Sequence, residues 1–129
     1  MSRSRMLKKE QPIEKTIGRQ DFISFGFAFL HDISYTDCND ADFFIKFLQR
    51  LKKLCNIEWS VISTTQRHSF GYEKIPIHSI KKDINITKDI KFLFAFRASG
   101  DNRAFLGFRD GNVFQIVFIE YKFGDIYNH

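Results

Sequence analysis

Strict alternation of large apolar and small residues from Phe22 to Leu30 is the feature that most constrains the fold of this chain. Side chains of a β-strand point to opposite faces in turn, so a period of two is typical of a strand. We therefore predict a strand over 22–30, with its small residues lying beneath a close neighbour. The large residues would form one buried row: Ile23, Phe25, Phe27 and Phe29.

A helix is predicted after this strand, capped at its start by Thr36, Asn39 or Asp40. Its apolar residues recur at the i, i+3, i+4, i+7 spacing of one buried face. They are Phe44, Phe47, Leu48, Leu51, Leu54 and Cys55. The basic residues Lys46, Arg50, Lys52 and Lys53 are expected on the solvated surface of this helix. A shorter helix is predicted from Ile57 to about Ser63, with Trp59 and Ile62 toward the core.

The second half of the chain predicts a long loop followed by three strands. Residues 64–90 show no clean period, so we predict a loop there, with a helical turn or short strand near Ile77–Ile80. Alternation returns in three segments, which are Lys91–Arg97, Arg103–Arg109 and Val113–Tyr121. Asp110-Gly111 predicts a hairpin between the last two, and the third strand is expected to be the most central.

This order of elements predicts a small α+β domain in which helices cover one face of an antiparallel sheet of three or four strands. A length of 129 residues suits one domain, placed here at residues 21–129. The 16 Phe residues are largely used by the alternating strands and the helix face, so they predict a dense core.

The net charge of +5 is concentrated in a predicted N-terminal arm. Residues 1–20 hold six basic and two acidic residues, whereas residues 21–129 hold 14 basic and 13 acidic residues. A basic arm favours a polyanion such as nucleic acid, and it is equally consistent with a flexible solubilising terminus.

The sequence argues against a membrane-spanning, a secreted or a zinc-binding protein. The longest apolar stretch has nine residues, far fewer than the roughly 20 that cross a bilayer. The start of the chain lacks the apolar region of a secretion signal, and no Cys or His spacing suggests a zinc site. We expect a cytoplasmic protein without membrane, metal or cofactor.

The polar residues that could carry chemistry lie in the predicted loop, at strand ends and in the last residues. RNA can be cleaved without a metal when one side chain accepts the proton of the 2′-hydroxyl and a second protonates the leaving 5′-oxygen. Cationic side chains then stabilise the charge that develops on phosphorus. The candidates for this catalysis are Glu73, Lys74, Arg109, Tyr127 and His129, with Glu73 or His68 as base and His129 as acid. The candidates for binding RNA are His68, Arg97 and Arg103, and Tyr127 could stack on a base.

Each candidate also has a structural interpretation. The arginines could pair with Asp101, Asp110 or Asp125, and Glu73 and Lys74 could form an exposed pair on a loop. His129 is the last residue of the sequence, a position where chains often fray.

The order strand, helix, helix and three antiparallel strands resembles the RelE/ParE superfamily of small bacterial toxins. Arg109, the following strand and the ending Tyr127-Asn-His129 are similar to its YoeB-like branch. This resemblance implies a metal-independent nuclease acting on ribosome-bound mRNA. The chain departs from it in a shorter second helix, a longer loop and a barely basic body.

Three segments also resemble a little-characterised family of small bacterial proteins. They are Gly71-Tyr-Glu-Lys-Ile75, Ala95-Phe-Arg97, and Gly107-Phe-Arg-Asp110 with Ile126-Tyr-Asn-His129.

Two functional hypotheses follow. The first is a toxin-like endoribonuclease of a toxin–antitoxin or phage-defence system, neutralised by an antitoxin protein. The second is a non-enzymatic module that binds nucleic acid or protein, as a regulator or a phage-encoded inhibitor.

Overall fold

A five-stranded mixed sheet organises the chain, seen here in a computed structural model that describes residues 21–64, 72–81 and 89–129. The spatial order is β1-β5-β4-β3-β2, and β1 runs parallel to β5 while all other neighbouring pairs are antiparallel. The strands are β1 (Ser24–Gly26), β2 (Glu73–Pro76), β3 (Phe92–Arg97), β4 (Ala104–Asp110) and β5 (Val113–Ile119). The predicted α+β class is confirmed. The prediction of a purely antiparallel sheet is wrong, because the long connection from β1 to β5 allows these two strands to run parallel.

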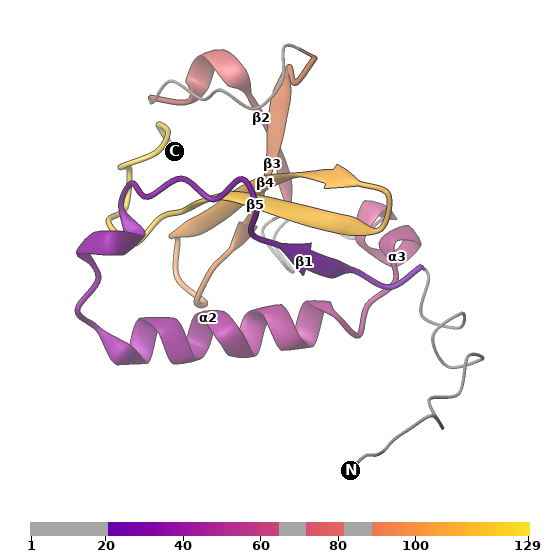
Figure 1. Cartoon of the computed structure of the whole chain (residues 1–129), viewed down its shortest axis with the longest axis horizontal. Coiled ribbons are helices and arrows are strands. Elements are labelled where there is room, and N and C mark those ends of the chain that lie inside the picture. The colour runs from indigo at the N-terminus through magenta and orange to yellow at the C-terminus, as the bar shows by residue number, and fades with distance from the viewer. Residues whose placement is uncertain (1–20, 65–71, 82–88) are drawn as a thin grey trace.

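Two helices pack on one face of the sheet, as predicted (Figure 1). The longer helix α2 (Ala41–Leu54) begins at Asp40, whose carboxylate accepts hydrogen bonds from the backbone N–H groups of Asp42 and Phe43. The shorter helix α3 (Trp59–Thr64) buries Trp59 and Ile62, also as predicted. None of the helices in the described part of the chain has the length and apolar character needed to cross a membrane.

The buried face of α2 is rotated relative to the predicted one. Phe43 is buried, whereas Leu48 keeps 66% of its surface exposed. The reason lies at the start of the helix, where the Phe43 ring packs 5.3 Å from the Tyr121 ring and 4.4 Å from the Arg103 guanidinium. The side chains that α2 buries are Phe43, Phe47, Leu51 and Leu54.

The predicted strand over 22–30 is wrong beyond Gly26. The chain turns there, with the Leu30 N–H donating to the Phe27 carbonyl, and it returns to β5 where the His31 N–H donates to the Val117 carbonyl at 2.7 Å. The cause is an irregularity in β5, since Gly107 of β4 pairs with Ile116 but Leu106 pairs with Phe118. The extra residue, Val117, prevents a straight partner from staying in register. Phe27 and Phe29, predicted to be buried, are 49% and 43% exposed.

The predicted loop over 64–90 contains a strand. β2 pairs with β3, with Glu73 opposite Ala95 and Pro76 opposite Phe92. Four residues ending in proline are too few to show alternation, which is why the sequence pattern missed them. The short 3₁₀ helix η2 (Ile77–Ser79) confirms the predicted helical turn. Because β2 extends the sheet, β4 and not β5 is the central strand.

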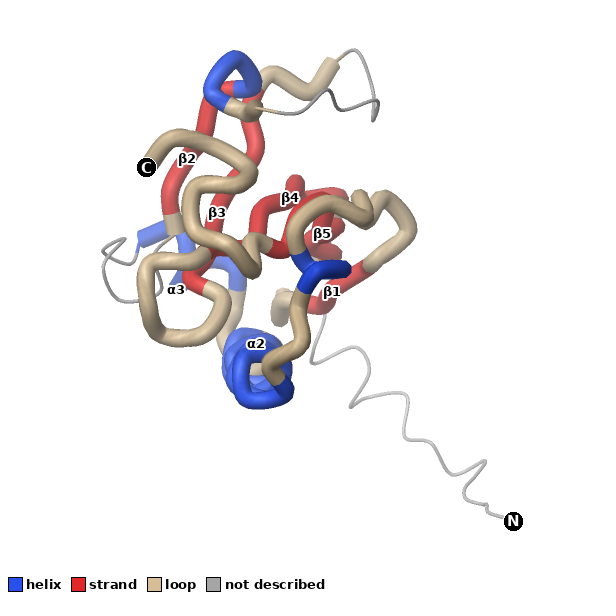
Figure 2. The backbone as a smooth tube through the Cα atoms, turned by 90° about the vertical axis from the view of Figure 1, so that its left-hand side faces the viewer, coloured by secondary structure: helices blue, strands red, loops and turns tan. Residues whose placement is uncertain are grey.

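The second face of the sheet is covered by loops and by the short 3₁₀ helix η2, without an α-helix among the described residues (Figure 2). Ile126 and Tyr127 of the C-terminal segment pack there beside Ile80. The Lys81 N–H donates to the Ile126 carbonyl at 2.7 Å, and Ile80 forms a bridge pair with Tyr127. This contact brings the last residues of the chain next to β2. The other predicted parts, the arm at 1–20 and the remainder of the loop, lie outside the described residues.

Candidate functional site

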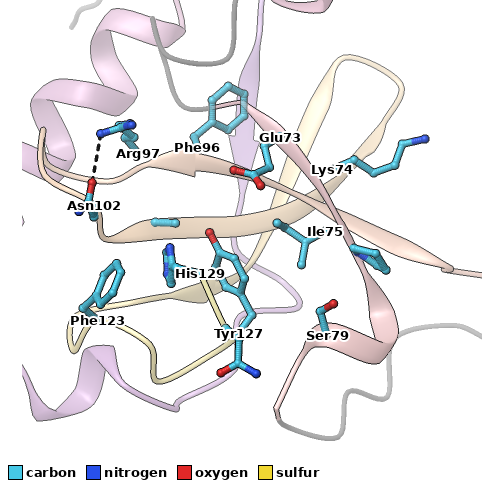
Figure 3. Close-up of a pocket in the computed structure, with 13 residues that line it drawn as sticks. Glu73, Lys74, Ile75, Ser79, Phe96, Arg97, Asn102, Phe123, Tyr127 and His129 are labelled. Carbon is cyan, nitrogen blue, oxygen red and sulfur yellow. Dashed lines mark hydrogen bonds between the residues drawn. The ribbon is translucent and has the colours of Figure 1, made fainter.

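A hollow of about 410 Å³ opens between β2, β3 and the C-terminal segment, and we call it the β2 hollow (Figure 3). It gathers most of the residues that the sequence singled out, although they are distant along the chain. Those that line it are Glu73, Lys74, Arg97, Tyr127 and His129.

Glu73 and Lys74 point away from each other because they are neighbours in a strand. In Figure 3 the Glu73 carboxylate points toward the Tyr127 hydroxyl, while Lys74 extends away from both. The Lys74 ammonium lies 4.3 Å from the centre of the Phe92 ring, a cation–π contact. Glu73 is therefore the acid–base group that β2 directs into the hollow.

His129 is held in one orientation from three sides. Its Nε2 lies 2.9 and 3.0 Å from the two carboxylate oxygens of Glu120. Its ring lies between the rings of Phe123 and Tyr127, with centroid distances of 4.1 Å to each. The His129 side chain retains 20% of its surface exposed, so a substrate in the hollow can reach it.

Glu120 holds His129 in the hollow, and the sequence pattern did not single it out. Its side chain is fully buried, and its carboxylate also accepts hydrogen bonds from the N–H groups of Ala104 and Gly124, at 3.1 and 2.8 Å. An ionised carboxylate only accepts hydrogen bonds, so these donors and the His129 Nε2–H suit it. The available signal was a glutamate directly after Ile116–Ile119, an apolar run of four residues, since a glutamate is almost never fully buried without partners.

The turn after Glu120 depends on Ser34. This residue is buried and has a positive φ of 74°, a conformation that costs a non-glycine residue energy. Its hydroxyl oxygen accepts hydrogen bonds from the N–H groups of Tyr121 and Lys122, at 2.9 and 3.1 Å. Ser34 thereby ends β5 and directs the chain toward Phe123 and His129.

Arg97 supplies positive charge at the rim of the β2 hollow. It is the last residue of β3, and its guanidinium donates to the Asn102 side-chain oxygen at 3.5 Å. Among the described residues this contact uses one of the five N–H donors of the guanidinium, so the others can bind an anion.

Two other candidates lie outside this group. The Arg109 guanidinium packs 4.3 Å from the Trp59 ring centre, and its Nε donates to the Gly111 carbonyl at 2.7 Å. Arg103 binds Asp101 at 2.7 Å and donates to the Tyr121 carbonyl at 3.1 Å. The hydrogen bonds between the Asp101 and Arg103 side chains lower the pKa of the Asp101 carboxyl and raise the pKa of Arg103. His68 lies outside the described residues.

The titratable side chains of the site are suited to proton transfer. A carboxylate on β2 and an imidazole oriented by a second carboxylate line one hollow, which is the arrangement of a general base and a general acid. Within residues 21–64, 72–81 and 89–129, no three His, Cys, Asp or Glu side chains gather into a group that could hold a metal ion.

Comparison with protein-family models, with curated proteins and with solved structures finds no match to this chain.

Proposed function

We propose that this protein is a metal-independent endoribonuclease that cleaves RNA in the β2 hollow. The observation that carries the proposal is that Glu73 and the anchored His129 line one hollow with Arg97 at its rim. These are an acid–base pair and a cation, the three groups that this cleavage requires.

In the proposed reaction, Glu73 accepts the proton of the substrate 2′-hydroxyl. The 2′-oxygen attacks the neighbouring phosphorus, and the bond from phosphorus to the 5′-oxygen breaks. His129 donates a proton to that 5′-oxygen. The products are a 2′,3′-cyclic phosphate on one fragment and a 5′-hydroxyl on the other.

Glu120 is a positioning residue in this scheme. Because the His129 Nε2 faces Glu120, the other ring nitrogen, Nδ1, is the atom that exchanges its proton with the substrate. The aromatic rings on both sides keep the imidazole in its plane, which reduces the cost of aligning it.

The residues that we propose for charge stabilisation and for base stacking differ from those predicted from the sequence. Arg97, and not Arg109, stands where it can stabilise the negative charge on phosphorus. Tyr127 is 5% exposed and its ring is covered by His129, whereas Phe123 is 55% exposed. Phe123 is therefore the ring that can stack on an RNA base.

The biological setting that we propose is a toxin–antitoxin or phage-defence system. A nuclease that cleaves cellular RNA without sequence restriction needs control in the cell that makes it, and a protein partner that covers the β2 hollow would provide that control. We propose such an antitoxin as its partner and mRNA, free or ribosome-bound, as its substrate.

The proposal is tested by cleavage of a single-stranded RNA oligonucleotide in excess EDTA. Glu73→Gln and His129→Ala should each lower kcat about 10²- to 10⁴-fold, the usual contribution of a general acid or base. Glu120→Gln should lower kcat about 10- to 100-fold, change KM less than twofold and shift the pH profile, because it acts through His129. Arg97→Ala should lose far more activity than Arg109→Ala.

Matched controls remove the same chemical groups elsewhere. Glu58→Gln and His78→Ala alter exposed residues outside the hollow and should cleave like wild type. Cleavage that survives both Glu73→Gln and His129→Ala, or that requires added metal, would contradict the proposal.

A non-enzymatic RNA-binding module is the second candidate. The observation that favours it is the stack of Phe123, His129 and Tyr127 rings beside Arg97, since aromatic rings and cations bind single strands without chemistry. Tight RNA binding without cleavage by the wild type would select this candidate.

A further inference from the structure

A second hollow, of about 210 Å³, lies between α2 and the connection from β3 to β4, and we call it the basic hollow. Its lining consists of Lys46, Gln49, Arg50, Lys53 and Ser99. Three of these side chains are cationic, and none of the described residues that line it is acidic.

The three cations share one side of α2 because they are spaced i, i+4 and i+7. At 1.5 Å per residue they span about 10 Å along the helix. Lys46 forms an ion pair with Asp42 at 3.1 Å. Arg50 and Lys53 have no acidic partner within 4 Å among the described residues, so they are the cations available to an anion.

Arg50 is also close enough to Arg97 to be affected by its charge. Burial lowers the pKa of Arg50, and the positive charge of Arg97 lowers it further. Arg97, the last residue of β3, lines the β2 hollow, and Ser99, two residues later, lines the basic hollow, so both hollows adjoin the same end of β3. A bound anion would relieve this repulsion.

We propose that Arg97, Arg50 and Lys53 form a track for the phosphates of single-stranded RNA, leading from the β2 hollow to α2. The identity of the strand rests on the proposed function. Arginine matches phosphate with its planar fork of donors, and the amide of Gln49 and the hydroxyl of Ser99 can donate further hydrogen bonds to phosphate oxygens. The track would bind RNA of any sequence, because it contacts the backbone.

The test measures binding of a labelled 12-nucleotide RNA to the full chain carrying His129→Ala, which should slow cleavage enough for binding to reach equilibrium. Adding Arg50→Gln and Lys53→Gln should raise Kd at least 10-fold. It should also reduce the slope of log Kd against log salt by about 1.4, since each phosphate contact on a single strand contributes about 0.7.

The matched control is Lys52→Gln with Lys91→Gln, which removes the same net charge from exposed positions and should change Kd less than twofold. Lys53→Glu alone is a second variant at an exposed position and should weaken binding in the same direction.

Equal losses in the two double variants would overturn the track, because they would show an effect of net charge alone. The track would also be overturned if the Arg50→Gln, Lys53→Gln variant lost as much affinity for a polyglutamate peptide as for the RNA. The surface would then suit an acidic protein as well as a nucleic acid.

Cleavage separates this proposal from the proposed function. In the otherwise wild-type chain, the ratio of kcat/KM for the 12-mer to that for a dinucleotide should fall about 10-fold in the Arg50→Gln, Lys53→Gln variant. If RNA is cleaved but neither this ratio nor binding changes, the track is wrong and the nuclease stands. If RNA is bound through these residues but never cleaved, the track stands and the nuclease is wrong.

Discussion

Asp101 and Arg103 form the best-connected exposed ion pair in the described structure, and they also receive support from the backbone. The Arg103 side chain binds both Asp101 oxygens, and the Arg103 N–H donates to one of them at 2.9 Å. Arg103 extends this contact to the Tyr121 carbonyl and to the Phe43 ring. The pair therefore connects the β3–β4 connection, the end of β5 and the start of α2.

From this ion pair we predict that the free energy of unfolding decreases at acidic pH. The hydrogen bonds from Arg103 lower the pKa of Asp101 in the folded state. Its contribution is therefore complete above the unfolded pKa of about 3.9 and is lost as the pH falls through the lower, folded value. Because Asp101 is 52% exposed, the contribution is less than about 1 kcal/mol.

Urea unfolding of wild type and Asp101→Asn between about pH 2.5 and pH 7 measures the effect. The difference in free energy of unfolding should be largest at neutral pH and shrink below about pH 4. Asp110→Asn, at an exposed position in the β4–β5 hairpin, is the control. If Asp110→Asn changed the free energy of unfolding as much as Asp101→Asn does, with the same dependence on pH, the assignment to Asp101 would be contradicted.

The residues of the site were predictable to different degrees. Glu73, Tyr127 and His129, which were predicted as site residues from their titratable groups and their positions beside the strands, do line one hollow. Arg109 was predicted to join them but does not line this hollow, because its guanidinium packs against Trp59, a contact that only the folded structure shows. Glu120 was missed because its role depends on donors 16 and 9 residues away along the chain.

At the scale of elements, the irregular pairing of β4 with β5 depends on Gly107. A Cβ atom at this position would lie 2.0 Å from the Gln115 carbonyl oxygen, and that backbone atom cannot move without separating the strands. We predict that Gly107→Ala lowers the free energy of unfolding by about 3 kcal/mol, the upper end of the usual cost of overpacking.

Gly26→Ala is the matched control for this prediction. A Cβ atom there would lie 2.5 Å from the side-chain oxygen of Gln115, which is the end of a flexible side chain. We expect a cost below about 1 kcal/mol, because the side chain can rotate away. Chemical unfolding of both variants measures the difference, and similar costs would show that the β4–β5 backbone tolerates a shift.

The elements with long, regular patterns were predicted best. Both helices, the hairpin after Asp110 and the three C-terminal strands are confirmed, because each pattern extends over at least one turn or several alternations. β2 was missed because pairing with β3, and not its own four residues, makes it a strand. The break after Gly26 was missed because its cause lies in a different strand, at Val117.

At the scale of the whole molecule, the two faces of the sheet are covered by unequal layers. Helices α2 and α3 cover one face, whereas short irregular segments cover the face with the β2 hollow. We predict that the Lys81 amide, which donates to Ile126, exchanges with solvent at least 10²-fold faster than the Phe105 amide in the central strand β4. The segments around residues 77–81 and 124–127 would then open without unfolding of the sheet.

Native-state hydrogen exchange at increasing denaturant tests this prediction. Exchange of Lys81 should be insensitive to low denaturant, as expected for local opening, whereas exchange of Phe105 should follow global unfolding. Equal rates and equal denaturant dependence would show that the cover of the hollow and the sheet unfold together.

The interruption of β1 has a consequence for how copies of this protein meet one another. β1 is an edge strand of the sheet, and the residues just before it pair with the residues just before α3 through the Phe22–Glu58 bridge and the hydrogen bond from the Ile23 N–H to the Ile57 carbonyl. A straight nine-residue strand with an aromatic row would be a template for edge-to-edge association and fibre formation. Ending the strand after Gly26 reduces this template to three residues and turns the following chain away. We therefore expect the turn that breaks the alternation also to limit edge-to-edge aggregation.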